Sequence, residues 1–236
     1  MPPLRVIPIE GIPEVEPGAE LAELIADAAA AQGSPLEAGD CLVVTQKIVS
    51  KAEGRLVPLD PDDRDARRRL VESESVRVLR RRGDLVISET RHGFVCANAG
   101  VDLSNVAQGT AALLPVDADR SARHVRDALR ARRGVDVAVI VSDTFGRPWR
   151  TGLTDVAIGV CGIAAVLDLR GERDALGREL QVTEVAVADE IASAAELVMG
   201  KSRGVPAAVV RGLDPGWFRD GSVRELVRPV SEDLFR

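Results

Sequence analysis

Asp102 and Asp143 are the two residues of this chain best placed to do chemistry. Asp143 follows the β-branched run 139–141 and precedes Thr144, while Asp102 follows Gly100 and precedes a turn rich in Ser and Asn. We expect each carboxylate just past a strand end, exposed but held by a rigid element. If the two converge, they would hold Mg²⁺ or Mn²⁺ against a phosphate, because hard cations prefer oxygen ligands. If they do not converge, both are solvated turn residues, the more common state of an aspartate.

Basic residues that could bind phosphate occur in three places. Lys47 and Lys51 follow a β-branched run typical of a buried strand, where helix-start amides would also face an anion. Arg147 lies just after the second aspartate, and a guanidinium suits a carboxylate or a phosphate. The segment 200–204 places a Lys and an Arg between two glycines. Each of these is also a common kind of solvated surface residue, so none of them alone identifies a site.

The segment 195–202 almost matches the phosphate-binding pattern GxxxxGK[ST]. Ala195 stands at the first glycine position, and the residues before Gly200 have helical period. A phosphate-binding loop follows a strand and opens a helix, whereas a glycine after a helix is the usual C-terminal stop. We therefore reject this motif and expect a helix that ends at Gly200.

Composition excludes several classes of protein. The net charge of −6 argues against nucleic acid and anionic membranes as partners, and 45% apolar residues are ordinary for a soluble chain. Three distant cysteines and two histidines give no disulfide framework and no zinc-binding pattern. The N-terminus lacks the features of a signal peptide, and the longest apolar stretch (156–167) is too short to span a bilayer, so we expect a cytoplasmic protein.

The remaining inventory of carboxylates, lysines and arginines fits phosphate chemistry with a divalent cation. No Ser-His-Asp arrangement and no GxGxxG after a strand is visible. On the residues alone, three functions stay open: a ligase, a nucleotide-binding regulatory module without catalysis, and a metal-dependent phosphohydrolase.

The elements that would position these residues alternate between strands and helices. Apolar periodicity predicts helices over 18–31, 46–52, 121–133 and 183–199, and one or two charged surface helices over 60–82. Short β-branched runs predict strands over 4–9, 41–45, 135–141 and 205–211, and a hairpin over 85–97. The type of 154–169 is ambiguous. Because hairpins occur alongside β-α units, we expect an α+β fold with mixed sheets.

Five runs along the chain resemble the coenzyme F-420-0:L-glutamate ligase family (the CofE family). These runs are 11–14, 49–55, 98–105, 142–147 and, near the C-terminus, 182–190 with 199–200. The resemblance extends in order over nearly the whole chain and is strongest to the N-terminal ligase domain of the two-domain actinobacterial version, FbiB. It implies one ligase module over 1–236, built as two interleaved lobes, and the C-terminal reductase domain of those relatives is not part of this sequence. A stand-alone ligase and an excised domain both stay open.

The resemblance implies a GTP-dependent reaction. L-glutamate would be joined by an amide bond to F-420-0 or its dehydro form, and further γ-linked glutamates would follow, through an acyl phosphate. It also implies two Mg²⁺ or Mn²⁺ ions, a K⁺ ion, a two-lobed fold and an intertwined homodimer. The length of the glutamate tail, the acceptor form and the choice of GTP over another nucleotide stay open.

The resemblance assigns roles to individual positions. It makes Asp102 and Asp143 the metal ligands, with Thr144 beside the second ion. From charge and position we add that Arg147 or Arg150 would orient a substrate carboxylate, and we take Arg147 as the catalytic candidate. The nucleotide contacts that it implies are Gly11, Ile12, Pro13, Glu14, Gln46, Lys47, Lys51, Asn105, Met199, Gly200, Lys201 and Ser202. The loop 200–204 departs from the family, since Lys201, Ser202 and Arg203 stand where archaeal members carry an acidic residue and more glycine.

Overall fold

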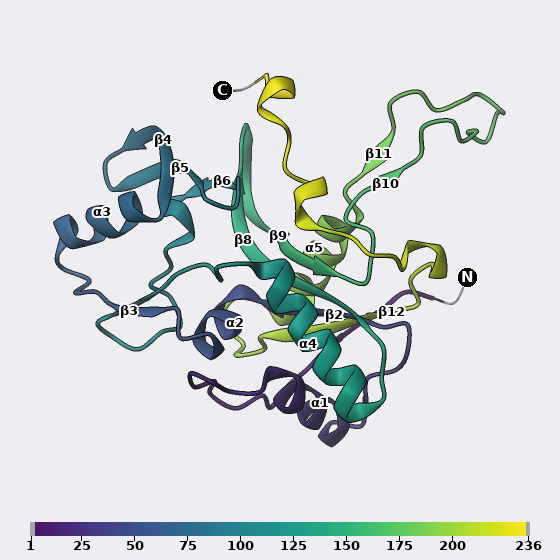
Figure 1. Ribbon diagram of the computed structural model, residues 1–236, viewed down its shortest axis with the longest axis horizontal. Coiled ribbons are helices and arrows are strands. Elements are labelled where there is room, and N and C mark those ends of the chain that lie inside the picture. The colour runs from purple at the N-terminus through teal and green to yellow at the C-terminus, as the bar shows by residue number, and fades with distance from the viewer. Residues whose placement is uncertain (1–2, 235–236) are drawn as a thin grey trace.

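A five-stranded mixed sheet forms the centre of the molecule in the computed structural model, which describes residues 3–234 (Figure 1). The strand order is β1-β12-β2-β8-β9. The strands are β1 (Arg5–Pro8), β12 (Ala207–Arg211), β2 (Cys41–Thr45), β8 (Ala138–Arg147) and β9 (Arg150–Cys161). Only β2 and β8 are parallel neighbours. Because β2, β8 and β12 are buried on both faces, their sequences are almost continuously apolar, which is the pattern of a covered sheet.

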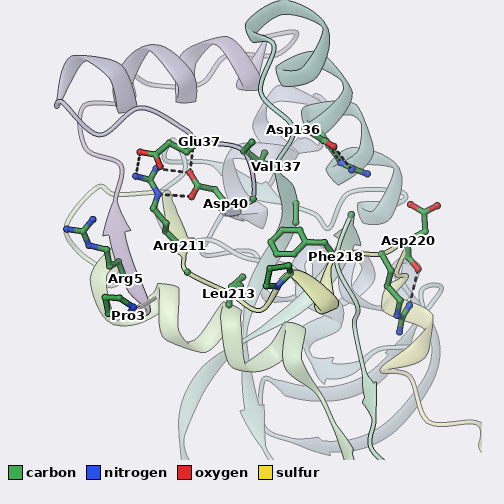
Figure 2. A pocket seen from close by; sticks show the side chains of 18 residues that line it. Pro3, Arg5, Glu37, Asp40, Asp136, Val137, Arg211, Leu213, Phe218 and Asp220 are labelled. Carbon is green, nitrogen blue, oxygen red and sulfur yellow. Dashed lines mark hydrogen bonds and ion pairs between the residues drawn. The ribbon is translucent and has the colours of Figure 1, made fainter. Parts of the chain in front are cut away.

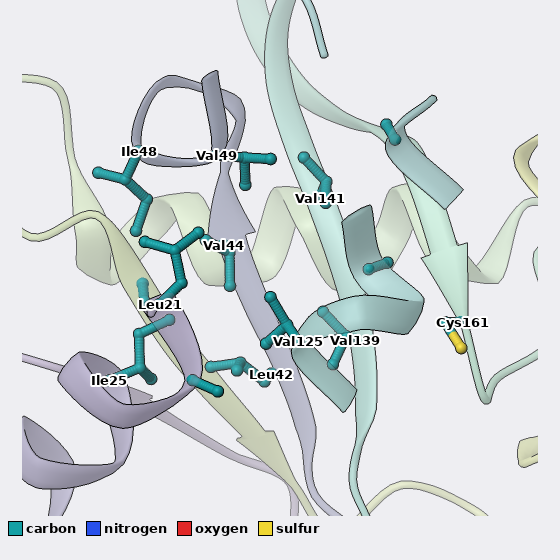
Figure 3. Packing of buried hydrophobic residues seen from close by; sticks show 14 of the residues in the cluster. Leu21, Ile25, Leu42, Val44, Ile48, Val49, Val125, Val139, Val141 and Cys161 are labelled. Atoms are coloured by element: carbon teal, nitrogen blue, oxygen red, sulfur yellow. The ribbon is translucent and has the colours of Figure 1, made fainter. Parts of the chain in front are cut away.

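Helices cover both faces of this sheet. The helices α1 (Leu21–Ala31), α2 (Gln46–Ala52) and α4 (Ala118–Arg133) share one buried cluster with alternate residues of β2 and β8 (Figure 3). The helix α5 (Val187–Met199) packs on the other face, against the residues that alternate with them. Asp117 caps α4 by accepting a hydrogen bond from the Arg120 amide, and Gly134 ends it in the left-handed conformation.

A second, smaller core lies beside the central sheet. It joins α3 (Arg64–Ser73) to a three-stranded sheet of β4 (Ser75–Arg82), β5 (Leu85–Thr90) and β6 (Val95–Ala97), and to the pair β3 (Leu56–Pro58) and β7 (Thr110–Ala112). Its buried members include Val71, Val86 and Leu113. The 3-10 turn η1 (Asn98–Gly100) follows β6 and leads directly to Asp102.

Two hairpins extend from the body of the molecule (Figure 1). The parallel pairing of β2 with β8 ends at Thr45 and Ser142, but β8 continues and pairs with β9 as far as Arg147. The second hairpin contains β10 (Leu167–Asp168) and β11 (Glu184–Val185). The remaining elements are the 3-10 turns η2 (Pro215–Trp217), η3 (Val223–Glu225) and η4 (Val230–Glu232).

The structure confirms the α+β class with mixed sheets and corrects three local predictions. The segment 60–82 is only half helical, because residues 75–82 form β4, in which Val76 and Val78 alternate with charged residues and which pairs with β5. The first half of the ambiguous segment 154–169 lies in β9, and its residues 167–168 form β10. Asp143 is within β8 rather than past its end, because the strand outlasts its parallel partner and continues as a hairpin.

Candidate functional site

A strained turn fixes the position of Asp102. Asn98 and Ala99 both have a φ of 52°, and Gly100 has a φ of 72°. A Cβ on Gly100 would lie 2.6 Å from the side chain of Leu114, so only glycine fits there. Beyond the turn, the Asp102 backbone exchanges hydrogen bonds of 2.9 and 2.8 Å with Ala112. A run of left-handed residues that the surroundings hold in place is typical of functional sites.

Lys47 joins the Asp102 carboxylate to the central sheet. Its Nζ lies 2.8 Å from Asp102 Oδ2 and donates to Ser104 Oγ at 2.7 Å. The Ser104 amide donates to Asp102 Oδ1 at 2.7 Å. Burial acts to raise the pKa of Asp102, but these contacts outweigh it and hold that pKa below its usual value. Asp102 is therefore an anion at neutral pH.

Asp143 is the carboxylate whose charge is least compensated. Burial raises its pKa to about 7, and repulsion from Asp102 and Asp155 adds to the rise. A hydrogen bond from the Thr144 backbone and the charge of Lys47 oppose it only in part. The repulsion from Asp102 indicates that the two carboxylates are close enough to interact electrostatically, which is the condition for a metal site shared between them. No ion pair joins Asp143 to any residue in the described range 3–234. A shared, uncompensated negative charge of this kind favours a bound cation.

Asp155 is a third carboxylate that the sequence analysis missed. It faces Thr144 across the β8–β9 pair, and its side chain is only 3% exposed. Thr144 Oγ1 donates to Asp155 Oδ1 at 2.7 Å and Ser142 Oγ donates to Asp155 Oδ2 at 3.1 Å. The available signal was a charged residue in an apolar run, since an aspartate is almost never fully buried without partners.

Lys201 reaches the same cluster from the loop after α5. Its Nζ lies 2.6 Å from Asp155 Oδ1 and 3.3 Å from Glu196 Oε1, and it makes a short contact to Thr144 Oγ1. Burial acts to lower the pKa of Lys201, but its carboxylate partners outweigh this and raise it. Lys47 thus forms an ion pair with Asp102, and Lys201 forms one with Asp155.

The residues fit one divalent ion more readily than a two-ion cage. Within the described part of the chain, no group of three or more His, Cys, Asp or Glu side chains is arranged to hold a metal ion. Asp102 and Asp143 nevertheless offer oxygen ligands with excess negative charge, which is the donor chemistry that Mg²⁺ and Mn²⁺ prefer. Thr144 lies next to this pair, but its hydroxyl is engaged by Asp155 and Lys201.

Two of the predicted nucleotide contacts, Gln46 and Lys51, lie at opposite ends of α2. Lys51 is buried and forms a close ion pair with Glu14 of the segment 11–14. Gln46 is also buried, and its amide nitrogen donates to Ser50 Oγ at 2.6 Å and to the Leu113 carbonyl at 3.0 Å. In this conformation Gln46 fastens α2 to the second core rather than facing solvent.

The other predicted contacts lie in different surroundings. Gly200 ends α5, as expected for a helix stop, while Met199 is buried in the core below α5. Asn105 is exposed with a φ of 53°, and Ser202 is exposed on the loop after α5. Arg147 donates to the Thr151 carbonyl at 3.1 Å in the turn of the β8–β9 hairpin. It lies four residues beyond Asp143, roughly 13 Å along the strand, so its catalytic role stays a prediction.

A cavity of about 920 Å³ lies at the end of the central sheet opposite to the aspartate cluster (Figure 2). It lies where β2 and β8 begin, whereas Asp143 lies beyond the point where their pairing ends. Most of its charged groups neutralise one another: Arg211 pairs with Asp40 and Glu37, and Arg126 pairs with Asp136. Size alone does not make it the site, because the uncompensated charge lies at the aspartate cluster.

Comparison with known proteins places the chain in a family. A family model described as F420-0:gamma-glutamyl ligase matches residues 11–212. The chain belongs to this family. A coenzyme F420:L-glutamate ligase from Methanothermobacter thermautotrophicus is 46% identical over 99% of both chains. The ligase of the same name from Methanopyrus kandleri is 46% identical over 100% of this chain and 99% of its own. The ligase of that name from Methanocaldococcus jannaschii is 40% identical over 92% and 90%.

Membership of the F420-0:gamma-glutamyl ligase family confirms the resemblance found in the sequence and identifies the chain as an amide-forming ligase. The residues that match the family model, 11–212, include both the Asp102 turn and the β8–β9 pair, so the whole aspartate cluster lies within the matched part of the chain. Among residues 3–234, no helix is long and apolar enough to cross a membrane.

Proposed function

We propose that this chain joins L-glutamate to F-420-0 by an amide bond in the biosynthesis of coenzyme F-420, with GTP as the energy source. Further glutamates would then be added through γ-linkages. The family membership supports the ligase class and its substrates. The observation that carries the use of a nucleoside triphosphate is the convergence of Asp102 and Asp143 beside Lys47, because phosphoryl transfer depends on positioned positive charge near paired carboxylates.

We assign a divalent ion, Mg²⁺ or Mn²⁺, to Asp102 and Asp143. Such an ion would neutralise charge on the triphosphate. Lys47 holds the Asp102 carboxylate ionised and in place through its 2.8 Å contact. K⁺ and an intertwined homodimer complete the proposal and rest on the resemblance to the family. A cytoplasmic location is also proposed and rests on the N-terminus and the short apolar stretches of the sequence.

The proposed reaction has two steps. A carboxylate oxygen of F-420-0 attacks the γ-phosphorus of GTP, the bond from that phosphorus to the bridging oxygen breaks, and GDP leaves. The amine of glutamate then attacks the acyl carbon, the amide bond forms, and phosphate leaves while the amine loses a proton. The acyl phosphate makes the carboxyl carbon reactive, which a free carboxylate is not.

Several of the chain's own residues would contact the nucleotide. The segment 11–14, with Glu14 held by Lys51, would contribute one set of contacts. Asn105 and Ser202, both exposed, would contribute others. Gly200 gives the loop after α5 its change of direction, with a φ of 62°. These nucleotide contacts remain part of the proposal.

Product masses test this function directly. The protein is incubated with F-420-0, GTP, Mn²⁺ and L-glutamate, and the products are analysed by mass spectrometry with each component omitted in turn. We expect masses that increase by glutamyl units only when all four components are present. Replacement of GTP by ATP tests the base, and the dehydro form of F-420-0 tests the acceptor. Phosphate release that does not require glutamate would instead indicate a phosphohydrolase.

The acyl-phosphate step has a separate test. F-420-0 labelled with ¹⁸O in its reacting carboxylate should transfer one label into the released phosphate. A phosphate without label would exclude that intermediate while leaving the ligase assignment intact.

A further inference from the structure

The three clustered aspartates differ in how their charge is compensated. Asp102 has the ammonium of Lys47 at 2.8 Å, and Asp155 has that of Lys201 at 2.6 Å. Asp143 interacts electrostatically with both of these aspartates but forms no ion pair of its own among the described residues. The cluster therefore already contains two fixed cations, and the charge that remains to be neutralised is centred on one carboxylate.

The contacts of Lys201 account for all of its hydrogen-bonding capacity. An ammonium has three N–H donors and no acceptor. Its Nζ contacts three oxygens: Asp155 Oδ1, Glu196 Oε1 and Thr144 Oγ1. These oxygens come from β9, α5 and β8, so the lysine joins the loop after α5 to both strands of the hairpin. An oxygen-lined position that could suit a metal ion is filled by a side chain of the protein itself.

Asp155 depends on this ammonium for its counter-charge. Its side chain is 3% exposed, and its other partners, Ser142 and Thr144, are neutral hydroxyls. The Lys201 side chain is 53% exposed, but the carboxylate that it neutralises is buried, so removal of the ammonium would leave a buried charge without a counter-ion, which is unfavourable. Without Lys201, the Asp155 charge would lie close to that of Asp143 and would have to be neutralised by another cation.

We propose that Lys201 is a positioning residue that acts as a built-in cation of the site, so that this chain binds one divalent ion, at Asp102 and Asp143, instead of two. This inference rests on the proposed function only for the location of that single ion. It predicts one ion where the family resemblance implied two. It also gives a reason why the loop 200–204 departs from the family pattern: Lys201 in this loop neutralises the charge of Asp155.

Mn²⁺ binding tests the inference without any ligase assay. The metal-free full chain is titrated with Mn²⁺ alone, and bound metal is counted by calorimetry and by the loss of the free-ion electron paramagnetic resonance signal. We expect one Mn²⁺ per wild-type chain. Lys201→Met keeps the aliphatic stem but removes the ammonium, and it should bind two.

Two further variants make the titration specific. Arg203→Met removes a neighbouring charge from the same loop, and its count should remain at one. Adding Asp155→Asn to Lys201→Met removes the carboxylate that would hold the second ion, and the count should return to one. Circular dichroism spectra establish that each variant is folded.

Every outcome of the Mn²⁺ titration either supports or contradicts the inference about Lys201. Two ions in the wild type, one ion in Lys201→Met, or no binding to the wild type would overturn the inference. The product-mass assay separates this result from the proposed function. A chain that binds one Mn²⁺ but forms no glutamylated product would leave Lys201 as the built-in cation and contradict only the ligase proposal.

Discussion

Lys47 Nζ lies 2.8 Å from Asp102 Oδ2 and so joins the first turn of α2 to the turn that follows η1. The contact connects the central sheet to the smaller core, because α2 follows β2 while Asp102 pairs through its backbone with Ala112 of β7. It also keeps Asp102 ionised, whereas the neighbouring Asp143 has a pKa of about 7. The two carboxylates therefore enter the site in different states.

Asp143→Asn should abolish ligase turnover while leaving the fold intact. The amide is almost the same size but provides no negative charge for a cation, so we expect turnover to fall by more than about 100-fold. Product formation at saturating GTP and Mn²⁺ measures the loss. Asp220→Asn is the matched control and should keep full turnover, because Asp220 is an exposed aspartate that lines the cavity at the opposite end of the central sheet. Comparable turnover in the two variants would contradict the metal assignment.

The metal-free protein should lose stability as the pH rises through the pKa of Asp143. That pKa is about 7 in the folded state and 3.8 for an ordinary aspartate. The folded state therefore favours the protonated form, and this contribution is fully present below about pH 4 and lost by about pH 7. Urea unfolding of the wild type and Asp143→Asn in EDTA, between pH 4 and 8, measures it. The variant should gain in relative stability up to pH 7, and a constant difference would refute the assignment.

Lys51→Met should weaken GTP binding more than it slows turnover. Lys51 is buried beside Glu14, so its charge is held where the proposed triphosphate pocket begins. Loss of a ground-state contact raises KM and leaves kcat nearly unchanged. Steady-state kinetics with GTP as the varied substrate provide the measurement. Arg5→Met, at an exposed position near the opposite cavity, should leave KM unchanged. An equal change in the KM for GTP in both variants would contradict the placement of Lys51 in the GTP pocket.

Gly159→Ala should destabilise the fold by about 1–3 kcal/mol or more. A Cβ at Gly159 would lie 2.3 Å from the Ala118 carbonyl oxygen, so β9 and the start of α4 would have to separate. Gly146→Ala is the control in the same hairpin, because a Cβ there meets no atom within 4 Å and the φ is not positive. Denaturant unfolding compares the two. Similar stabilities would show that β9 and α4 are packed less closely than described.

Most helices and strands of the central sheet could be predicted from local pattern. The segments 41–45 and 46–52 match β2 and α2 residue for residue, since β-branched runs and amphipathic spacing act over a few neighbours. The segment 75–82 could not, because its high charge concealed the alternation of Val76 and Val78, and only pairing with β5 makes it a strand.

The sequence by itself determined the family and the fold class and singled out Asp102 and Asp143 as candidate ligands, because these depend on residue types in a fixed order. The tertiary structure decided which charges meet. Asp155 enters the site through the cross-strand register that places it opposite Thr144, and Lys201 meets it from a segment 46 residues away. Such contacts depend on long-range packing of strands and helices, and no local pattern in either segment encodes them.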